Sequence, residues 1–300
     1  FCIEVYKMNN KEKVFRTLVL IVVFISTVLI VNLINNTGAG NVTAEMEQPT
    51  LPLVYVNYQD VQINQLNGYI NDVDITLLRD TITPMDKEKT IKLWIDQNSK
   101  KVDSVRYELR SISNNSLVEE DNISDFKEED GYKKLDITLR TNIVQAQEYM
   151  LVIDLQKNDK TIAKYYTRII YEKSMHAKEI LDTVMSFDNS IFDGSNASAV
   201  GGKLEPNSTG NNEDLSFIDI HSNYETVTWA GMSPMKITQS VPRIVEIDTN
   251  FACVELNYVI VSNIDGSSRN YLVKERYRVR WVDESTIYLE IPGNIKDASE

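Results

Sequence analysis

The first strong pattern along the chain is an uninterrupted apolar segment near its amino end. Residues 17–34 read TLVLIVVFISTVLIVNLI, carry no charge and have polar side chains only at Thr17, Ser26, Thr27 and Asn32. A helix of this length can just cross the hydrocarbon core of a bilayer, which needs ~20 residues, while satisfying its own backbone groups. A helix in a soluble core would keep one polar face, and this segment has none. We therefore predict a transmembrane anchor at 17–34.

The charges around this segment predict its orientation. No Lys or Arg follows it until Arg79, whereas four basic residues precede it: Lys7, Lys11, Lys13 and Arg16. Positive-inside bias makes residues 1–16 a cytoplasmic tail and puts the body outside the cell membrane, as in a single-pass protein. A cleaved secretory signal is the alternative, but the apolar region of such signals spans only ~7–15 residues. We favour an uncleaved signal anchor.

Beyond the anchor the pattern changes to short stretches with a period of two. Residues 35–50 are small and polar without periodicity, so we expect a stalk there. Structure is expected from Leu51 onward, and turn-forming clusters between the later strands favour an antiparallel β-sandwich over 51–172. Four groups of alternating apolar residues each predict a half-buried strand: Ile91, Leu93 and Ile95; Val105, Tyr107 and Leu109; Leu135, Ile137 and Leu139; Tyr149, Leu151, Ile153 and Leu155.

The succession of these strands resembles that of immunoglobulin and fibronectin-like modules. The stretch VDSVRYELRS, followed later by EYMLVIDL and TIAKYYTRIIY, is similar to the middle and closing strands of such modules. The resemblance lies in the pattern alone, because the Cys pair that joins the two sheets of antibody domains is absent. It implies an Ig-like sandwich at 51–172, and such a fold does not by itself indicate a function.

A connecting helix and a second β-rich region follow the first. We assign residues 173–192 to a helical segment and predict the helix itself at about 174–192, capped by Ser174. Its apolar stripe is formed by Ala177, Ile180, Leu181, Val184 and Met185. Residues 193–214 are rich in Gly, Asn and Ser and predict a linker or long loop. A second β-rich domain is expected at 215–300. Its last residues, NIKDASE, lack an apolar pattern, which leaves open a truncation within or after this domain. The fold class is therefore mainly β, with two β-rich extracytoplasmic domains after the anchor.

One hairpin of the second domain can be given a register from the sequence. If the turn after strand 252–262 is centred on Gly266 and Ser267, apolar residues pair on one face: Ile260 with Val273, Leu256 with Tyr277, Val254 with Val279, and Ala252 with Trp281. The other face then sets Glu255 against Arg278, Asn257 against Arg276 and Cys253 against Arg280. The pair of Tyr258 with Glu275 fits imperfectly.

The polar face of this hairpin carries a row of basic residues. Lys274, Arg276, Arg278 and Arg280 alternate along one strand, with side chains ~6.7 Å apart. They are the candidate binding residues for a ligand that bears carboxylate or phosphate groups. A solvated strand face, partly neutralised by Glu255, is the simpler interpretation, and we favour it because cross-strand charge pairs commonly stabilise sheets.

Charge and cysteine content narrow the classes of function. Beyond residue 34 the chain has 27 basic and 42 acidic residues, a net charge of −15, which would repel nucleic acid and anionic lipid or wall polymer. We expect no nucleic-acid partner. Cys253 is the single cysteine of this part, so no intrachain disulfide can form there, and this favours a bacterial surface over a secreted eukaryotic protein.

Candidate catalytic and metal-binding groups are sparse in the sequence. Cys253, His221 and Arg280 on a membrane-anchored β protein resemble the thiolate, acid/base and oxyanion groups of a sortase, but the signature T-L-x-T-C is absent. Ser233 and Lys236 match S-x-x-K without its companion motifs. Asp219 and His221 would share one strand face, yet zinc sites usually need three or four ligands.

The remaining candidate is an acidic run at 119–130. It lacks the spacing and the turn glycine of an EF-hand, so we interpret it as a solvated loop. The sequence thus predicts no metal and no cofactor.

These observations favour a non-catalytic interaction or regulatory protein, anchored in the membrane and acting in the cell envelope of a bacterium. Its expected partners are the membrane itself and a protein within the membrane or the envelope. Two alternatives stay open: a cell-wall-directed enzyme such as a sortase-like thiol transpeptidase, and an ectodomain that senses a small ligand.

Overall fold

The computed structural model describes residues 10–36, 50–98, 100–193, 197–213, 215, 217–264, 267–283, 286–290 and 292–297. The chain divides into two compact units, one with the amino-terminal helix and one that holds residues 47–298. The protein is mainly β, with several antiparallel sheets in the second unit and one apolar helix near the amino terminus. The stalk expected at 35–50 lies almost wholly outside the described residues.

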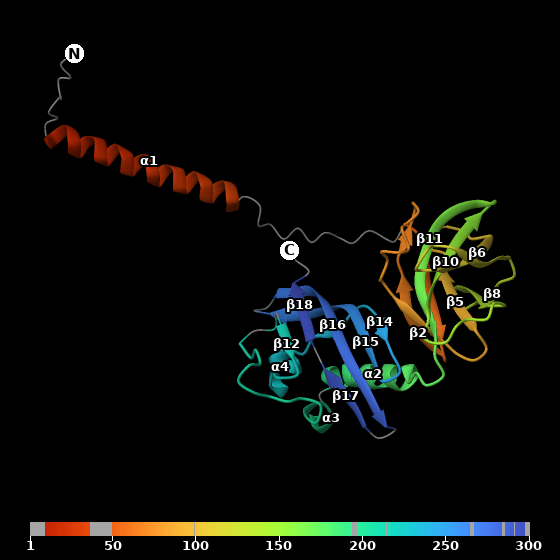
Figure 1. Cartoon of the computed structure of the whole chain (residues 1–300). Helices are drawn as coiled ribbons and strands as arrows, with labels where there is room; N and C mark the ends of the chain where they lie inside the picture. Colours follow the sequence, from red (N-terminus) through yellow and green to blue (C-terminus); the bar gives the residue numbers. More distant parts are fainter. Residues whose placement is uncertain are drawn as a thin grey trace, which may run out of the picture. The chain divides into compact units, whose positions relative to one another are not determined.

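Helix α1 (Asn10–Asn36) forms where the sequence predicts the anchor, and it is drawn as one continuous helix (Figure 1). Its segment Val14–Val31 is long and apolar enough to span a membrane, and none of that segment is buried within the protein. The hydroxyls of Ser26 and Thr27 each donate to the carbonyl four residues earlier, at 2.8 Å. Both polar groups are therefore satisfied inside the helix, as an apolar environment requires.

Two facing sheets make up residues 51–171. The first, sheet A, has the strand order β2-β1-β5-β9-β8: β2 (Val61–Leu66), β1 (Leu53–Tyr58), β5 (Thr90–Asp96), β9 (Tyr132–Thr138) and β8 (Lys127–Glu129). The second, sheet B, has the order β3-β11-β10-β6-β7: β3 (Gly68–Tyr69), β11 (Lys160–Tyr171), β10 (Glu148–Lys157), β6 (Ser104–Ser111) and β7 (Leu117–Ile123). Strand β4 (Ile82–Met85) adds to β11 in parallel.

The four alternating apolar groups of the sequence fill the space between sheets A and B. All of their members are buried, including Leu93 of β5, Leu109 of β6, Ile137 of β9 and Ile153 of β10. Period-two patterns form strands here because each strand can bury one row of side chains against the facing sheet. This part of the sequence prediction is confirmed.

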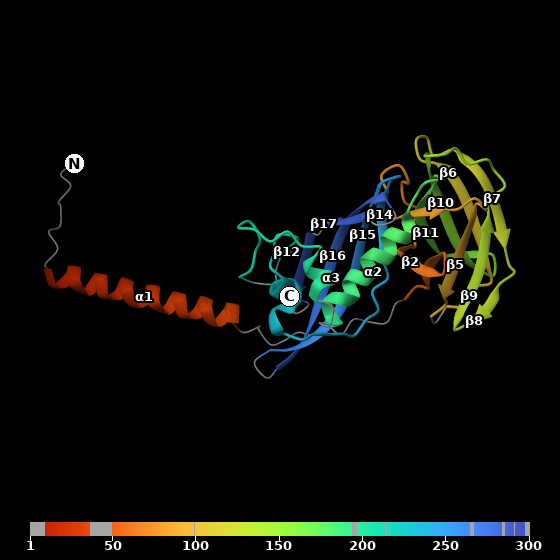
Figure 2. The ribbon, with the colours of Figure 1, turned by 90° about the horizontal axis from the view of Figure 1, so that it is seen from below.

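The second β region contains a helix and a further antiparallel sheet, sheet C (Figure 2). Sheet C has the order β12-β18-β16-β15-β13, with β14 also on β15 and β17 also on β16: β12 (Phe217–Asp219), β18 (Pro292–Asp297), β16 (Ser267–Asp283), β15 (Phe251–Ile264), β13 (Met235–Lys236), β14 (Arg243–Ile247) and β17 (Thr286–Glu290). β18 includes residues 294–297 of the tail in which the sequence predicted no apolar pattern.

Helix α2 (Ala177–Asp193) packs on sheet C against β15 and β16. Its predicted stripe faces the core: Ala177, Ile180, Leu181 and Val184 are buried, and Met185 is partly buried against them. The helix begins three residues later than expected, and the predicted cap at Ser174 is wrong: the Ile180 amide donates to the His176 carbonyl. The hydroxyl of Ser174 instead donates to Glu172.

The predicted linker at 193–214 is partly folded. A short helix α3 (Ala197–Gly201) lies in it, and Val200 and Leu204 join the core. The amide of Glu205 donates to the Ile220 carbonyl at 2.7 Å. Further on, α4 (Tyr224–Val227) and a turn of 3₁₀ helix, η1 (Trp229–Gly231), lead to β13. Val200 and Leu204 thus pack this segment against the core, although its composition is otherwise typical of a linker.

The register of the β15–β16 hairpin differs from the prediction by two residues. Ala252 pairs with Val279, Glu255 with Arg276, and Ile260 with Tyr271. The pair nearest the end of the hairpin is Ile264 with Ser267. A shift of two residues keeps every side chain on its predicted face. The predicted faces are therefore right and the predicted partners are wrong.

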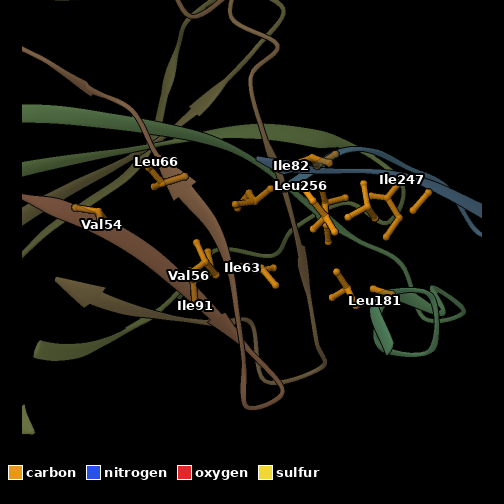
Figure 3. Close-up of a cluster of buried hydrophobic side chains, with 14 of the residues drawn as sticks. Val54, Val56, Ile63, Leu66, Ile82, Ile91, Leu181, Ile247 and Leu256 are labelled. Atoms are coloured by element: carbon orange, nitrogen blue, oxygen red, sulfur yellow. The ribbon is translucent and has the colours of Figure 1, made fainter. Parts of the chain in front are cut away.

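Side chains of both β regions meet in one buried cluster (Figure 3). Ile63 and Ile82 of the first region lie in the same cluster as Leu181 of α2, Ile247 of β14 and Leu256 of β15. A polar contact runs through it: Asn64, fully buried with a φ of 48°, accepts from the Ile244 amide at 2.8 Å and donates to the Ile82 carbonyl at 2.9 Å.

Candidate functional site

The predicted basic row lies on the face of sheet C opposite to the face that packs on α2. Lys274, Arg276, Arg278 and Arg280 are all exposed and alternate with the buried residues of β16. The guanidinium of Arg278 lies 4.5 Å from the ring centre of Phe251. The structure therefore sets the four residues in one row, as the sequence predicts.

Acidic groups lie among these basic side chains. Glu255, opposite Arg276 in the register, is buried and lies 3.6 Å from Nη1 of Arg243 on β14. Arg243 also forms an ion pair with Asp80, which precedes β4. The residue opposite Arg278 on β17 is Glu290. Glu255 thus brings one negative charge close to the row, beside the cation of Arg243.

Cys253 is buried on this same face, 3.5 Å from a carboxylate oxygen of Glu246. Burial raises the pKa of its thiol, and the Glu246 charge adds to this, while Arg276 acts in the opposite direction. His221 lies in the turn after β12, where Nδ1 contacts the Asn207 amide at 2.9 Å and the Glu205 carbonyl at 3.0 Å. The described contacts of Cys253 do not reach His221.

The other two candidate pairs of the sequence, Ser233 with Lys236 and Asp219 with His221, do not form sites either. Ser233 lies in a loop with a φ of 45°, whereas Lys236 is on β13 and forms an ion pair with Asp188. Asp219 ends β12 and accepts from the backbone amide of His221 at 2.9 Å, so the two do not share a strand face. Within the part of the chain that the structure describes, no group of three His, Cys, Asp or Glu residues could hold a metal ion.

The acidic run read as a solvated loop is a strand, β7, followed by the hairpin β8–β9. Glu119 is buried and accepts hydrogen bonds from three groups: the Tyr107 hydroxyl at 2.8 Å, the Arg140 amide at 3.1 Å and the Thr141 amide at 2.7 Å. Burial opposes ionisation of Glu119, but these hydrogen bonds together outweigh it and hold its pKa at about 2. The next residue, Glu120, forms an ion pair with Arg106, and its carboxylate lies on the surface.

A second group of buried polar side chains lies between α2 and sheet C, and the sequence prediction missed it. Asp188 of α2 is fully buried and forms an ion pair with Lys236 of β13. The hydroxyls of Tyr258 and Tyr277 each donate to one oxygen of Glu275 at 2.8 Å. We call Asp188, Lys236, Tyr258, Glu275 and Tyr277 the buried carboxyl cluster.

Three features describe the electrostatics of this cluster. Lys236 is its one basic side chain among the described residues, and Nζ lies over the rings of Phe192 and Tyr258 at 4.5 and 4.2 Å. Burial, and then the charge of Asp188, raise the pKa of Glu275 to about 7. Burial likewise raises the pKa of Asp188, whereas Lys236 opposes the rise.

Both carboxyl groups left a signal in the sequence. Asp188 occupies a position of the apolar helical stripe, four residues after Val184 and three before the buried Ile191. Glu275 interrupts the inward-facing apolar positions of β16, between Val273 and Tyr277. A charged residue at a core position of each of two packed elements predicts a polar pair between them.

No protein-family model matches the chain, and none of the curated proteins compared with it matches.

Proposed function

We propose that the protein is a non-catalytic interaction or regulatory protein of a bacterial cell surface, held in the membrane by α1 with its β-rich body outside. One observation carries the proposal: the segment Val14–Val31 of α1 has no buried part, and after Arg16 in its first turn it carries no charge, so it is apolar on every side. Such a helix is stable in a bilayer and would be costly to expose to water. Arg16 and Lys11 at its amino end favour a cytoplasmic amino terminus.

For residues 51–171 we propose an Ig-like sandwich. The strand order β1-β5-β9-β8 of sheet A has the form A-B-E-D, and β11-β10-β6-β7 of sheet B has the form G-F-C-C′. Tyr149, near the start of the F-like strand, accepts at 3.4 Å from the amide of Val144 just upstream, which is similar to the tyrosine corner of these modules. The extra strands β2, β3 and β4 between the A-like and B-like positions depart from the usual pattern.

The state of Cys253 supports a non-catalytic role. A nucleophilic thiol needs a lowered pKa and access to its substrate, whereas burial and the nearby Glu246 raise the pKa of this thiol. We expect Cys253→Ala to leave the cellular phenotype of the protein unchanged. Loss of that phenotype, with the variant still folded and in the membrane, would favour the thiol transpeptidase instead.

The experiment that tests the anchored topology uses the full chain in cells. We expect the protein to stay in the membrane fraction after alkaline carbonate extraction, and protease added to intact spheroplasts to digest the body. A variant in which Val22 and Leu29 are both replaced by Arg should leave the membrane, because each charge at the bilayer centre costs about 2.5–3.5 kcal/mol. Survival of the body until the spheroplasts are permeabilised would contradict the orientation.

The interaction role is tested by crosslinking in the same cells. Photo-crosslinkers placed at exposed positions of the body should give discrete products with one envelope protein. Products with no defined partner from any exposed position would contradict the role.

A further inference from the structure

The buried carboxyl cluster holds more acid than base. Asp188 and Glu275 could each carry a negative charge, and Lys236 supplies one positive charge to both. Lys236 is paired with Asp188, while the described residues that donate to Glu275 are Tyr258 and Tyr277, through their hydroxyls. With both carboxyl groups ionised, the cluster has a net negative charge inside the core, which is costly. Uptake of one proton makes it neutral.

The Tyr258 side chain interacts with both carboxyl groups: its hydroxyl donates to Glu275, and it also stands within hydrogen-bonding reach of Asp188. A hydroxyl has one hydrogen, so it cannot serve both as a donor. Oδ1 of Asp188 is buried, and none of the described residues donates to it. Oδ1 of Asp188 is therefore an acceptor without a described donor, and a proton shared between Asp188 and Glu275 can satisfy it.

The cluster joins two elements that could separate. Asp188 belongs to α2, and its partners belong to β13, β15 and β16 of sheet C. The charged and titratable groups that face the pair are Lys236 from β13, Tyr258 from β15 and Tyr277 from β16, with the Ser240 hydroxyl 3.4 Å from Asp188. From β18 the residue opposite Glu275 is Gly293, which has no side chain to titrate.

We propose that Asp188 and Glu275 form a proton-linked latch, which holds α2 on sheet C while the pair shares a proton and loosens α2 when that proton leaves to solvent. The inference does not depend on the proposed function, since it concerns only contacts inside the second β region. It predicts that the native state binds one proton more tightly than the unfolded chain does.

The direction of the pH effect follows from that difference. The pKa of Glu275 is about 7 in the folded protein and 4.5 as its ordinary value. The stabilisation is thus fully present below pH 4.5 and is lost as the pH rises through 7. Between pH 5.5 and 8.5, the equilibrium constant for closing α2 onto sheet C should fall on the order of tenfold or more.

Hydrogen exchange of the detergent-solubilised full chain, read by mass spectrometry over α2 and corrected for the intrinsic rate at each pH, measures this constant. We expect α2 to open more often as the pH rises, and Glu275→Gln or Asp188→Asn to remove the dependence. Glu246→Gln is the matched control, because Glu246 is an exposed carboxylate of β14 in the same sheet, and it should keep the wild-type dependence. Equal pH dependence in wild type and Glu275→Gln would overturn the proposal.

A second measurement uses the wild-type chain alone, so it does not depend on whether a variant folds. The infrared spectrum of the wild-type chain should keep a protonated-carboxyl band up to about pH 6, above the range in which exposed carboxyl groups ionise. Absence of that band above pH 5 would also overturn the proposal.

Discussion

Glu119 and Glu275 are both buried carboxyl groups in β-sheets, but they differ in charge state. Glu119, in the first β region, has a pKa of about 2 and keeps its charge. Glu275, in the second, has a pKa of about 7 and keeps its proton well above the usual range. Burial raises the pKa in both places, so burial alone does not decide the outcome.

The difference lies in the donors and in the neighbouring charges. Glu119 accepts from a hydroxyl and two backbone amides, and Arg140 Nε lies 3.5 Å away. Glu275 accepts from two hydroxyls and has the carboxyl group of Asp188 nearby. Fixed amides and a cation offset desolvation, whereas two hydroxyls beside a second acid do not. The first carboxylate is therefore a structural anchor, and the second is poised to exchange a proton.

The largest expected effect is the loss of the Glu119 anchor. Glu119→Ala leaves a buried hydroxyl and two part-buried backbone amides without their acceptor, so we expect the free energy of unfolding to fall by about 3 kcal/mol. Urea denaturation at pH 7 measures it. Glu120→Ala is the matched control one residue away: its carboxylate is exposed and pairs with Arg106, and its loss should cost less than about 1 kcal/mol. Equal losses would show that Glu119 is not buried as described.

The contact between the two β regions gives the next effect. Asn64→Ala removes the acceptor of the Ile244 amide and places Ala at a φ of 48°. We expect a loss of about 2 kcal/mol from the unpaired amide and the backbone strain. Asn64→Gly, which tolerates this backbone conformation, should recover part of the loss. A glycine variant as unstable as the alanine variant would assign the whole effect to the hydrogen bonds.

The two carboxyl groups should change the free energy of unfolding at opposite ends of the pH range, which we call the acid limb and the alkaline limb. The folded-state pKa of Glu119 is below its ordinary value of 4.5, so its stabilisation is present above pH 4.5 and is lost as the pH falls towards 2. The Glu275 contribution is lost in the other direction, as the pH rises through 7. In unfolding measured across pH 2–9, Glu119→Gln should flatten the acid limb only, and Glu275→Gln the alkaline limb only. If either variant changed both limbs equally, the two sites would not be independent.

The smallest effects come from single hydroxyls. Tyr107→Phe leaves Glu119 with its two amides, and Tyr258→Phe leaves Glu275 with Tyr277 alone. Each should lower the free energy of unfolding by about 1 kcal/mol at pH 6. Both changes remove a hydrogen bond to the charged form, so both should raise the pKa of the carboxyl group concerned. A lowered pKa of Glu275 in Tyr258→Phe would mean that this hydroxyl does not donate to Glu275.

The local patterns of the sequence predict much of this fold. The apolar run of α1, the four alternating groups of the facing sheets and the stripe of α2 are each visible within one element, because each element has to bury its own face. The faces of the β15–β16 hairpin follow from alternation in the same way. Its register could not be predicted in the same way: a turn centred on Gly266 and Ser267 gives pairs that differ by two residues from the observed ones, in which Ile264 pairs with Ser267.

The partners of the buried charges could not be predicted from local patterns. Glu119 was assigned to solvent because its neighbours Glu120 and Asp121 are charged, while the amides that bind it lie 21 and 22 residues later. Asp188 and Lys236 are 48 residues apart and meet only when α2 lies on sheet C. The basic row at 274–280 can be predicted because it lies on one strand, and the structure sets Glu255 of β15 opposite Arg276 within it. A binding role for that row stays a prediction.

The most direct test of the comparison is a pH titration of the side-chain carboxyl ¹³C shifts of Glu119 and Glu275 in the full chain, assigned with Glu119→Gln and Glu275→Gln. We predict that Glu119 titrates at about 2 and Glu275 at about 7. Titration of both groups together near 4.5 would contradict the account.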